Sequence, residues 1–349
     1  MKPFICSALS ALICLISSSA LAQNRVLTVD NNPGAVAMFK NITDAYEAAK
    51  GGDTILLAGS PNQYGQLVIK KRLNLVGPGY YLAENKIPGL STQYAYVGIS
   101  LGIGPESSSA GSTFTGLYLS IQPDSGITGA AYERIGNIII DRCFGTGGYF
   151  DYQVTIRRSL ITGHIHLQAS GSSIRNSIIG GPEFGAVSLN LKGGTTAANC
   201  VFAALPNTEE LSSISSSIFA LINPDVTAAQ YAQSVKGSVS YSMAVAPAPL
   251  FGSTFKGANF LPVGGGNING IATELVFAGT GAVDAKWKLR ANSPAMGKGF
   301  DGVDMGAFGG PSPYILGGVP SIPRVTRFVV PAAVTSTSGL RFEVDAQSF

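Results

Sequence analysis

The chain has 349 residues, 12% of them charged, and its formal net charge is +3. This length suits one elongated repeat domain, and so small a positive surplus does not suggest nucleic acid as a partner. Charge alone also gives little support for a polyanionic partner.

Residues 1–22 have the composition of a secretory signal peptide. Lys2 precedes an apolar run over residues 4–16, and the small-residue site Ala20-Leu21-Ala22 predicts cleavage before Gln23. The run is too short for the roughly 20 residues that cross a bilayer. We therefore expect an exported protein, periplasmic, outer-surface or extracellular, with no transmembrane segment in the mature chain.

A short amphipathic helix is expected after the signal segment, because apolar residues there follow the spacing i, i+3, i+4, i+7. These residues are Ile42, Ala45, Tyr46 and Ala49. Asn41 or Thr43 can cap the helix, and the glycine pair at 51–52 ends it. Because the first coil of a solenoid needs a cover, we expect this helix to be a lid. The first coils are expected from residues 53–58, 66–69 and 73–76.

The middle third of the chain carries a repeat in which a small residue is followed by apolar ones and preceded, three positions earlier, by a β-type residue. The six copies are Ile140 with Cys143-Phe144, Ile156 with Ser159-Leu160, Ile174 with Ser177-Ile178, Ala197 with Cys200-Val201, Ile214 with Ser217-Ile218 and Val239 with Ser242-Met243. The small residues are 16, 18, 23, 17 and 25 positions apart. A short, imperfect repeat that changes length only in its gaps is typical of stacked β-coils. It predicts an all-β protein, a right-handed parallel β-helix.

Stacking accounts for the residue types in this repeat. Parallel coils lie roughly 4.8 Å apart, so like residues form columns, and an interior column accepts only side chains that stack without clashing. The position before the small residue is expected in a tight bend, since two of its occupants are asparagine. Its occupants are Arg142, Arg158, Asn176, Asn199, Ser216 and Tyr241. The alternative, a β-sandwich, predicts alternation and hairpin turns, but no Asn-Gly or Asp-Gly pair links these segments.

The cysteines fit the same register. Cys6 and Cys14 lie in the signal segment, while Cys143 and Cys200 share one repeat position three coils apart. That separation is about 14 Å, beyond the limit of about 7 Å for a disulfide. We therefore expect two buried free thiols and no disulfide framework.

The flanking regions have weaker periodicity. Residues 80–135 and 246–285 are expected to form coils with long loops that project from one face. Residues 311–323 form a Pro- and Gly-rich link, and residues 325–330 and 340–346 alternate well enough to pair as two strands. The expected organisation is a signal peptide (1–22), a parallel β-helix (23–310) and a linker with a C-terminal β-ribbon (311–349).

Two stretches resemble a known superfamily. Residues 39–79, with the capping helix, DTILL at 53–57 and LNLVG at 73–77, resemble the start of exported pectin-lyase-like right-handed parallel β-helix proteins. NSPA at 292–295 with DMGAFG at 304–309 looks like their closing coil, in particular that of uncharacterised Bacteroidota members. The resemblance implies the fold over residues 26–310. It implies little about function, because this scaffold hosts lyases, hydrolases, adhesins and non-catalytic surface proteins.

The catalytic signatures of that superfamily are not found in this sequence. Polygalacturonase-like members carry Asn-Thr-Asp, Asp-Asp, Gly-His-Gly and Arg-Ile-Lys in that order, which supplies paired carboxylates. Here Gly163-His164-Ile165 comes first and Asn207-Thr208-Glu209 later, with no Asp-Asp and no Arg-Ile-Lys. There is also no Trp-Ile-Asp-His motif and no aspartate-rich calcium loop of the pectate-lyase type. We assign no catalytic residue and lean against an enzyme.

Five residues are candidates for binding: Tyr149, Tyr152, Arg158, His164 and His166. The two tyrosines beside Arg158 suit a platform on which sugar rings stack, although packing of a loop against the coil is the favoured explanation for them. The two histidines alternate, so they share a face and are expected to meet Asp141, Asp151 or Arg158 on adjacent coils. A metal site needs a third ligand that the sequence does not provide, so neither a metal nor a cofactor is assigned.

Two functions remain open from the sequence. The first is a secreted or cell-surface, non-catalytic β-helix that binds a glycan or an envelope protein. The alternative is a divergent polysaccharide lyase or glycoside hydrolase whose acid and base are not recognisable. The missing motifs favour the first function.

Overall fold

The computed structural model describes residues 24–88, 90–105, 107–145, 147–181, 183, 187–203, 206–220, 233–246, 261–329 and 343–347. The expected signal peptide, residues 1–22, lies outside them. Within the described residues, no helix combines the length and the apolar character needed to cross a membrane.

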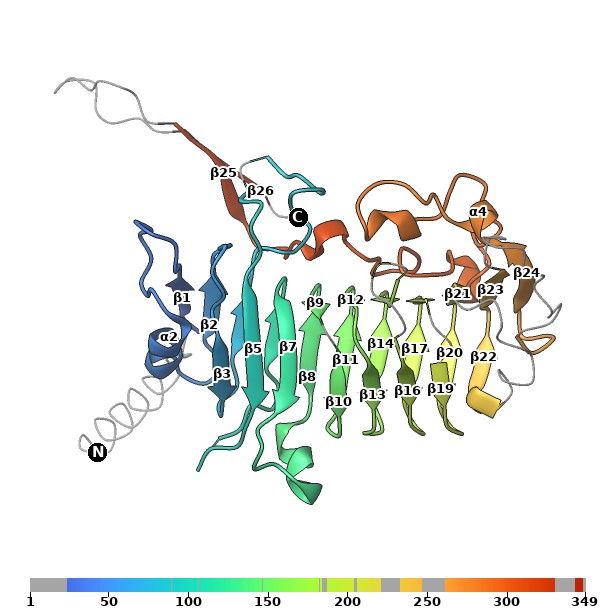
Figure 1. The fold of residues 1–349 in the computed structure, drawn as a ribbon, viewed down its shortest axis with the longest axis horizontal. Coiled ribbons are helices and arrows are strands. Elements are labelled where there is room, and N and C mark those ends of the chain that lie inside the picture. The colour runs from blue at the N-terminus through green and yellow to red at the C-terminus, as the bar shows by residue number, and fades with distance from the viewer. Residues whose placement is uncertain are drawn as a thin grey trace, which may run out of the picture.

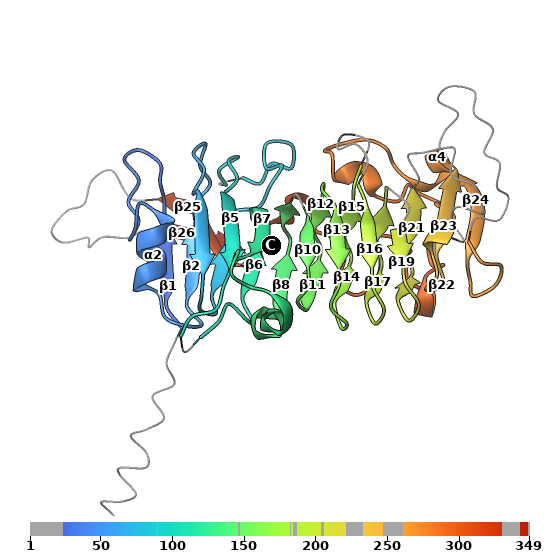
Figure 2. The same ribbon diagram turned by 60° about the horizontal axis from the view of Figure 1, so that its bottom comes forward.

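The chain forms a right-handed parallel β-helix, as the repeat predicts, with coils stacked along one axis (Figure 1). The first sheet contains β1 (Val26–Val29), β2 (Thr54–Leu57), β4 (Asn74–Val76), β6 (Thr113–Thr115), β8 (Ile138–Asp141), β11 (Val154–Arg157), β14 (Ser173–Arg175), β17 (Thr196–Ala198), β20 (Ser213–Ser215) and β22 (Ser238–Ser240). The second contains β3 (Gln66–Ile69), β5 (Tyr96–Leu101), β7 (Tyr118–Pro123), β9 (Phe144–Gly145), β12 (Leu160–Ile161), β15 (Ile178–Ile179), β18 (Val201–Phe202), β21 (Ile218–Ala220), β23 (Met243–Ala246) and β24 (Ile268–Ala272). The third is shorter and contains β10 (Gly148–Phe150), β13 (Ile165–Leu167), β16 (Leu189–Leu191) and β19 (Pro206–Thr208), which Figure 2 shows turned forward.

The strand register confirms the repeat position by position. Ile156 pairs with Ile140 on one side and Ile174 on the other, and the column continues through the remaining copies to Val239. Leu160 likewise pairs with Phe144 and with the next copy, and that column ends at Met243 and Ile268. Each coil therefore presents the same residues to its neighbours, with the varied lengths absorbed by the loops.

The bend between the first and second sheets adopts one backbone conformation in every repeat copy. All six residues that precede the small residue have a positive φ, between 48° and 52°. Asparagine tolerates this left-handed region, whereas Arg142, Ser216 and Tyr241 adopt it only because the surrounding coils impose it. The tight bend expected from the two asparagines is thus confirmed for all six positions.

The small residue after this bend is selected by hydrogen bonding as well as by size. The Ser177 hydroxyl donates to the carbonyl of Arg175 (2.8 Å) and accepts from the amide N–H of Ser159 (3.2 Å) on the preceding coil. Ser159, Ser217 and Ser242 repeat both contacts. Buried backbone groups need such partners, so a side chain of this kind satisfies the bend while it joins adjacent coils.

The N-terminal lid lies where the sequence predicts it. Helix α2 (Ile42–Ala48) covers the first coil, and the side chain of Asn41 accepts from the N–H of Asp44 (2.8 Å) as its N-cap. Ile42 and Ala45 are buried in the core. Strand β1, which precedes the helix, was not anticipated from the sequence and adds one strand to the start of the first sheet.

Long connections separate the strands of residues 80–135, as expected, and one of them contains the 3₁₀ helix η1 (Gly129–Ile135). In the second loop-rich region, β24 is followed by helix α4 (Thr273–Val276), while residues 247–260 lie outside the described part. Three further 3₁₀ turns follow, namely η2 (Ala285–Trp287), η3 (Phe300–Gly302) and η4 (Leu316–Gly318).

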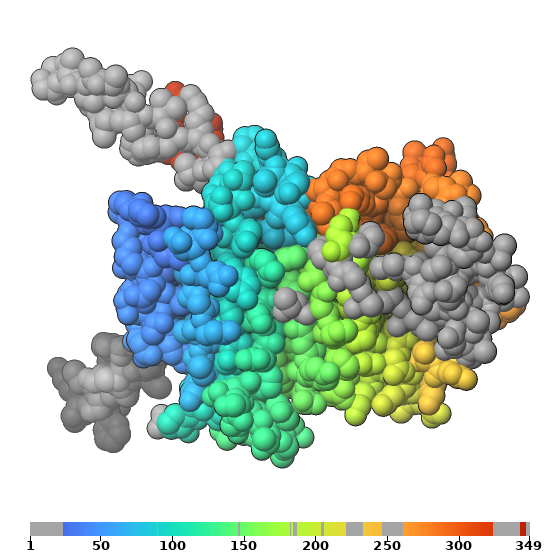
Figure 3. All heavy atoms as spheres, viewed as in Figure 1, coloured from blue at the N-terminus to red at the C-terminus, as the bar shows by residue number. Residues whose placement is uncertain are grey.

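Residues 273–320, which we call the strap, run back along the outside of the second sheet (Figures 1 and 3). One residue of each short strand in this sheet faces outward, and these residues form a second buried cluster with the strap: Leu160, Ile178, Val201, Ile218, Met243, Val276, Ala295, Met305, Ala307 and Tyr314. The side-chain amide of Asn176 donates to the carbonyls of Ala307 (3.2 Å) and Gly309 (2.7 Å) in the strap. The expectation that residues 292–310 form a closing coil is therefore wrong. The second sheet is apolar on both faces, so its outer face requires a cover.

A buried carboxylate ties the strap to the loop after β4. Asp284 accepts hydrogen bonds from the N–H of Gly317 (2.8 Å) and from the side-chain amide of Asn85 (3.1 Å). The Tyr314 hydroxyl donates to it (3.3 Å) and lies 2.5 Å from the hydroxyl of Tyr80. Burial raises the pKa of both tyrosines well above the usual value, so their hydroxyls stay protonated and available as donors.

The expected C-terminal ribbon is present. Strand β25 (Arg324–Val329) pairs antiparallel with β26 (Glu343–Gln347), and residues 330–342 between them lie outside the described part. The link into β25 lies beside the first coils, where Ile322 and Pro323 line a groove together with Leu57. The strap therefore carries the chain back to the N-terminal end of the solenoid, instead of leaving the ribbon on the last coil.

The first prediction concerns the small-residue column. Ser177→Leu should lower the free energy of unfolding by about 1–3 kcal/mol, because the added side chain overfills a fully buried site and removes both hydroxyl contacts. Thermal melts and limited proteolysis measure this effect. Ser238→Leu, at an exposed position of the first sheet, is the matched control. Equal melting temperatures for the two variants would contradict the assignment of Ser177 to a buried column of small residues.

A second prediction concerns the thiols. Cys143 and Cys200 are free and fully buried, and burial raises the pKa of each thiol to about 12. Alkylation of the folded protein near neutral pH should therefore be slow, since the thiolate is the reactive form. Alkylation in urea without a reductant should label both, as mass spectrometry will show. A denatured protein that takes up no label would reveal a disulfide and overturn the register.

Candidate functional site

The outer face of the third sheet carries a column of polar and aromatic side chains. Tyr149, His166, Asn190 and Asn207 are register partners on four successive strands. Tyr149 is 62% exposed, and its ring stacks on the His166 imidazole with centroids 4.0 Å apart and an interplanar angle of 10°. The structure thus brings together two of the residues that the sequence singled out, from adjacent coils.

Both histidines accept a hydrogen bond from the next coil. Nδ1 of His164 lies 3.0 Å from the backbone N–H of Ser188, and Nδ1 of His166 lies 2.6 Å from the side-chain amide nitrogen of Asn190. In these contacts Nδ1 of each imidazole is the acceptor, which leaves Nε2 of each ring as the donor. Burial lowers the pKa of His166, and the neighbouring His164 lowers it further. Among the described residues, no group of three His, Cys, Asp or Glu side chains is arranged to hold a metal ion.

Tyr152 does not belong to this surface. It is 1% exposed and packs edge-to-face against Phe150, with ring centroids 5.7 Å apart. Its assignment as a binding residue is wrong, and packing of the loop against the coil accounts for it. An exposed and a buried tyrosine three positions apart look alike in the sequence, because the turn after β10 decides which one points inward.

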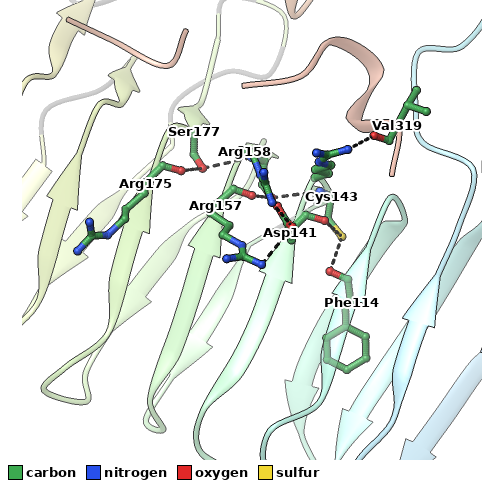
Figure 4. A network of polar contacts seen from close by, with 10 residues as sticks. Phe114, Asp141, Cys143, Arg157, Arg158, Arg175, Ser177 and Val319 are labelled. Atoms are coloured by element: carbon green, nitrogen blue, oxygen red, sulfur yellow. Dashed lines mark hydrogen bonds and ion pairs between the residues drawn. The ribbon is translucent and has the colours of Figure 1, made fainter. Parts of the chain in front are cut away.

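Arg158 lies on a different part of the molecule, at the bend between the first and second sheets (Figure 4). Its Nε donates to Oδ1 of Asp141 (2.8 Å), and Arg157 contacts Oδ2 of the same carboxylate (3.3 Å). Asp141 is thereby occupied by arginines of the next coil. The expectation that the histidines meet Asp141 or Arg158 is wrong, because those groups lie on separate sheets.

A second candidate site, which the sequence analysis missed, is a pocket near the N-terminal end of the second sheet. Its volume is about 270 Å³, and we call it the tyrosine pocket. It is lined by Ser60, Pro61, Asn62, Gln63, Tyr94, Tyr96 and Tyr118. The outward column of the second sheet contains three aromatic register partners, Tyr96, Tyr118 and Phe144. The strap covers the same column from Leu160 onward. Tyr94 is 43% exposed at the mouth of this pocket.

The rings of the tyrosine pocket hold one another in place. The ring of Tyr118 lies edge-to-face against Tyr96 (4.8 Å between centroids) and against Phe144 (4.6 Å), and it contacts Tyr94 at 5.4 Å. Burial and the two adjacent tyrosines raise the pKa of Tyr118, so its hydroxyl remains a hydrogen-bond donor. The pocket therefore combines fixed aromatic surface with polar groups at its edge.

The opposite wall of the pocket is a loop between β2 and β3. Ser60 Oγ accepts from the N–H of Asn62 (3.0 Å), which closes a tight turn. The Asn31 side chain donates to the carbonyls of Asn62 and Gln63, both at 3.3 Å. These bonds hold the wall in position, and Asn62 and Gln63 remain accessible at the edge of the pocket.

A sequence signal for this pocket exists in two forms. Tyr94 and Tyr96 are two positions apart, so in a strand they point to the same face. In addition, Gly116-Leu117-Tyr118 has the same relation to the bend as Arg142-Cys143-Phe144, and Gly116 also has a positive φ, 65°. Extending the repeat by one coil toward the N-terminus therefore locates Tyr118 outside the sheet.

No protein-family model matches this chain, and no curated protein matches its sequence. Function is therefore argued from the geometry of these surfaces, since one fold hosts unrelated activities.

The third prediction tests the third-sheet column of Tyr149, His166, Asn190 and Asn207, which we call the histidine column. By NMR titration, His166 should protonate below the usual histidine value of about 6.5, and His164→Gln should move its pKa upward by removing the adjacent imidazole. The unfolded chain binds this proton first, so stability should decrease as the pH falls through about 6.5. A His166 that titrates at or above its usual value would contradict the packed, hydrogen-bonded imidazole.

Proposed function

We propose that this protein is an exported, non-catalytic β-helix of the pectin-lyase-like type that binds a glycan on its outer surface. The observation that carries the proposal is the tyrosine pocket, in which Tyr94, Tyr96 and Tyr118 face Asn62 and Gln63 across a cavity. The signal-like residues 1–22 support export to the periplasm, the outer surface or the medium.

The pocket has the chemistry that sugar rings require. A pyranose presents an apolar face of C–H groups, which packs on an aromatic face, and a periphery of hydroxyls, which needs amide and hydroxyl partners. Both are available here, since the tyrosine rings form one wall and Asn62 and Gln63 the other. At about 270 Å³ the cavity is near the lower end of ligand sites, roughly 300–1,000 Å³. This size suits the end or a branch of a glycan.

The same pocket gives no support to cleavage. Glycoside hydrolysis uses two carboxyl groups, and a lyase needs a base to remove a proton. The residues that line the pocket include no carboxylate, imidazole or amine. A glycan held there has no carboxylate, imidazole or amine beside it, and the raised pKa of Tyr118 makes that phenol a poor base, which favours a binding protein over a divergent lyase or hydrolase.

The fourth prediction tests this site. A glycan array probed with the full-length protein should identify a neutral glycan, and Tyr94→Ala should weaken its binding about tenfold by removing an exposed ring at the mouth. Tyr118→Phe, which keeps the ring, should retain most of the affinity. Isothermal titration calorimetry on the array hit measures both.

Tyr149→Ala is the matched control, because it removes an exposed tyrosine from the third sheet instead. Loss of binding in Tyr149→Ala with full binding in Tyr94→Ala would transfer the site to the histidine column. A reducing-end assay on the bound glycan should remain at background, and release of sugar ends would refute the non-catalytic assignment.

A further inference from the structure

Four arginines from three successive coils gather at the bend between the first and second sheets, and we call them the arginine cluster: Arg142, Arg157, Arg158 and Arg175. Arg157 and Arg158 contact one carboxylate, that of Asp141, as Figure 4 shows. The small net charge of the whole chain conceals this local excess, because the four side chains become neighbours only when the coils stack about 4.8 Å apart.

Two members of the cluster, Arg157 and Arg175, form one column with Asp141. Asp141, Arg157 and Arg175 are register partners on β8, β11 and β14. The residues that precede them, such as Ile156, are buried in the core, so this column faces solvent. In Figure 4 the side chain of Arg175 points away from Asp141, which leaves its guanidinium on the open face of the first sheet.

The positive charge in the cluster is not balanced. Asp141 is shared by Arg157 and Arg158, and among the described residues no carboxylate lies within ion-pair distance of Arg175. The Arg157 side chain is 43% exposed, whereas its Nε is buried and has no hydrogen-bond partner among the described residues. An anion bound at Arg175 and at the exposed part of Arg157 would supply a countercharge on this face.

Arg142 lies on the inner side of the cluster, next to the strap. It is mostly buried and donates to the carbonyl of Val319 in the strap. Burial lowers its pKa, and the proximity of Arg158 lowers it further despite Asp141.

Hydroxyl groups lie beside the exposed arginines. Thr155 and Thr196 lie two positions before the arginine column or its extension, on the same face and partly exposed, whereas their register partner Ser173 is buried. Guanidinium groups bind carboxylate or sulfate through two parallel N–H bonds, and neighbouring hydroxyls add single donors. A first-sheet face with both kinds of donor suits an oxyanion on an extended ligand.

We infer that the arginine cluster binds the anionic groups of an acidic glycan, a carboxylate or a sulfate, with Arg175 and Arg157 as its main donors. The inference rests on the proposed glycan-binding function but uses a different face from the tyrosine pocket. Arg158 and Asp141 orient Arg157 and do not contact the ligand.

Binding of three polymers with one backbone to the full-length protein tests the site: dextran, carboxymethyl-dextran and dextran sulfate. Both charged polymers, or one of them, should bind and dextran should not, and the difference between them identifies carboxylate or sulfate as the preferred group. Arg175→Gln should weaken binding about tenfold. Lys192→Gln, which removes an equal charge from an exposed position elsewhere, is the control and should leave affinity within about twofold.

Equal losses in Arg175→Gln and Lys192→Gln, or no binding of either charged polymer, would overturn the inference. Arg175→Lys keeps the charge without the planar fork and should recover part of the affinity, while matching melting temperatures show that each variant folds. If a single-stranded oligonucleotide competed as strongly as the charged dextrans, the ligand of the cluster would be nucleic acid and not a glycan. Tyr94→Ala should still bind the charged polymer, so failure of the tyrosine pocket and failure of the arginine cluster are seen separately.

Discussion

The bend between the first and second sheets is the constraint on which the rest of the molecule depends. A residue with positive φ turns the chain, and the following serine or cysteine enters the core. The serine hydroxyl then bonds its own coil through a carbonyl and the preceding coil through an amide, as at Ser177. Because this unit holds each coil in register with the next, every outward position becomes part of a column. The surfaces of the molecule therefore consist of residues that recur at the same position of successive coils. A change at one bend alters the alignment of the columns beside it.

Each outward column has a different character, and this divides the surface into regions with separate chemistry. The second-sheet column is aliphatic from Leu160 onward and lies under the strap, but it is aromatic at Tyr96 and Tyr118, where the tyrosine pocket opens. The first-sheet column becomes cationic at Arg157 and Arg175. A glycan held in the pocket and an anionic chain on the first sheet would engage neighbouring faces of one rigid body. Such a body needs no conformational change to bind, so the entropy cost of association stays low.

The strap explains how a solenoid with one sheet that is apolar on both faces remains a stable unit. It removes the outer column of the second sheet from water, and Asn176 holds it through two carbonyls. At its far end the buried Asp284 connects it to Asn85 and Tyr314, so the cover is fastened by polar contacts as well as by apolar packing. The contact between Asn85 and Asp284 joins residues 199 positions apart. Local patterns in the sequence carry no trace of such a contact.

The sequence alone predicts the parallel β-helix, the register of its six repeat copies, a tight bend in each copy, the lid helix and the two free thiols. It does so because each of these follows from residue size and spacing within about 25 positions, and stacking repeats the same local requirement. The tertiary structure decides that residues 292–310 form part of a strap, that Tyr152 is buried while Tyr149 is exposed, and that the histidines lie apart from Arg158. It also decides the two proposed binding sites. Their side chains come from different coils, and only the accumulated lengths of the loops determine which ones become neighbours.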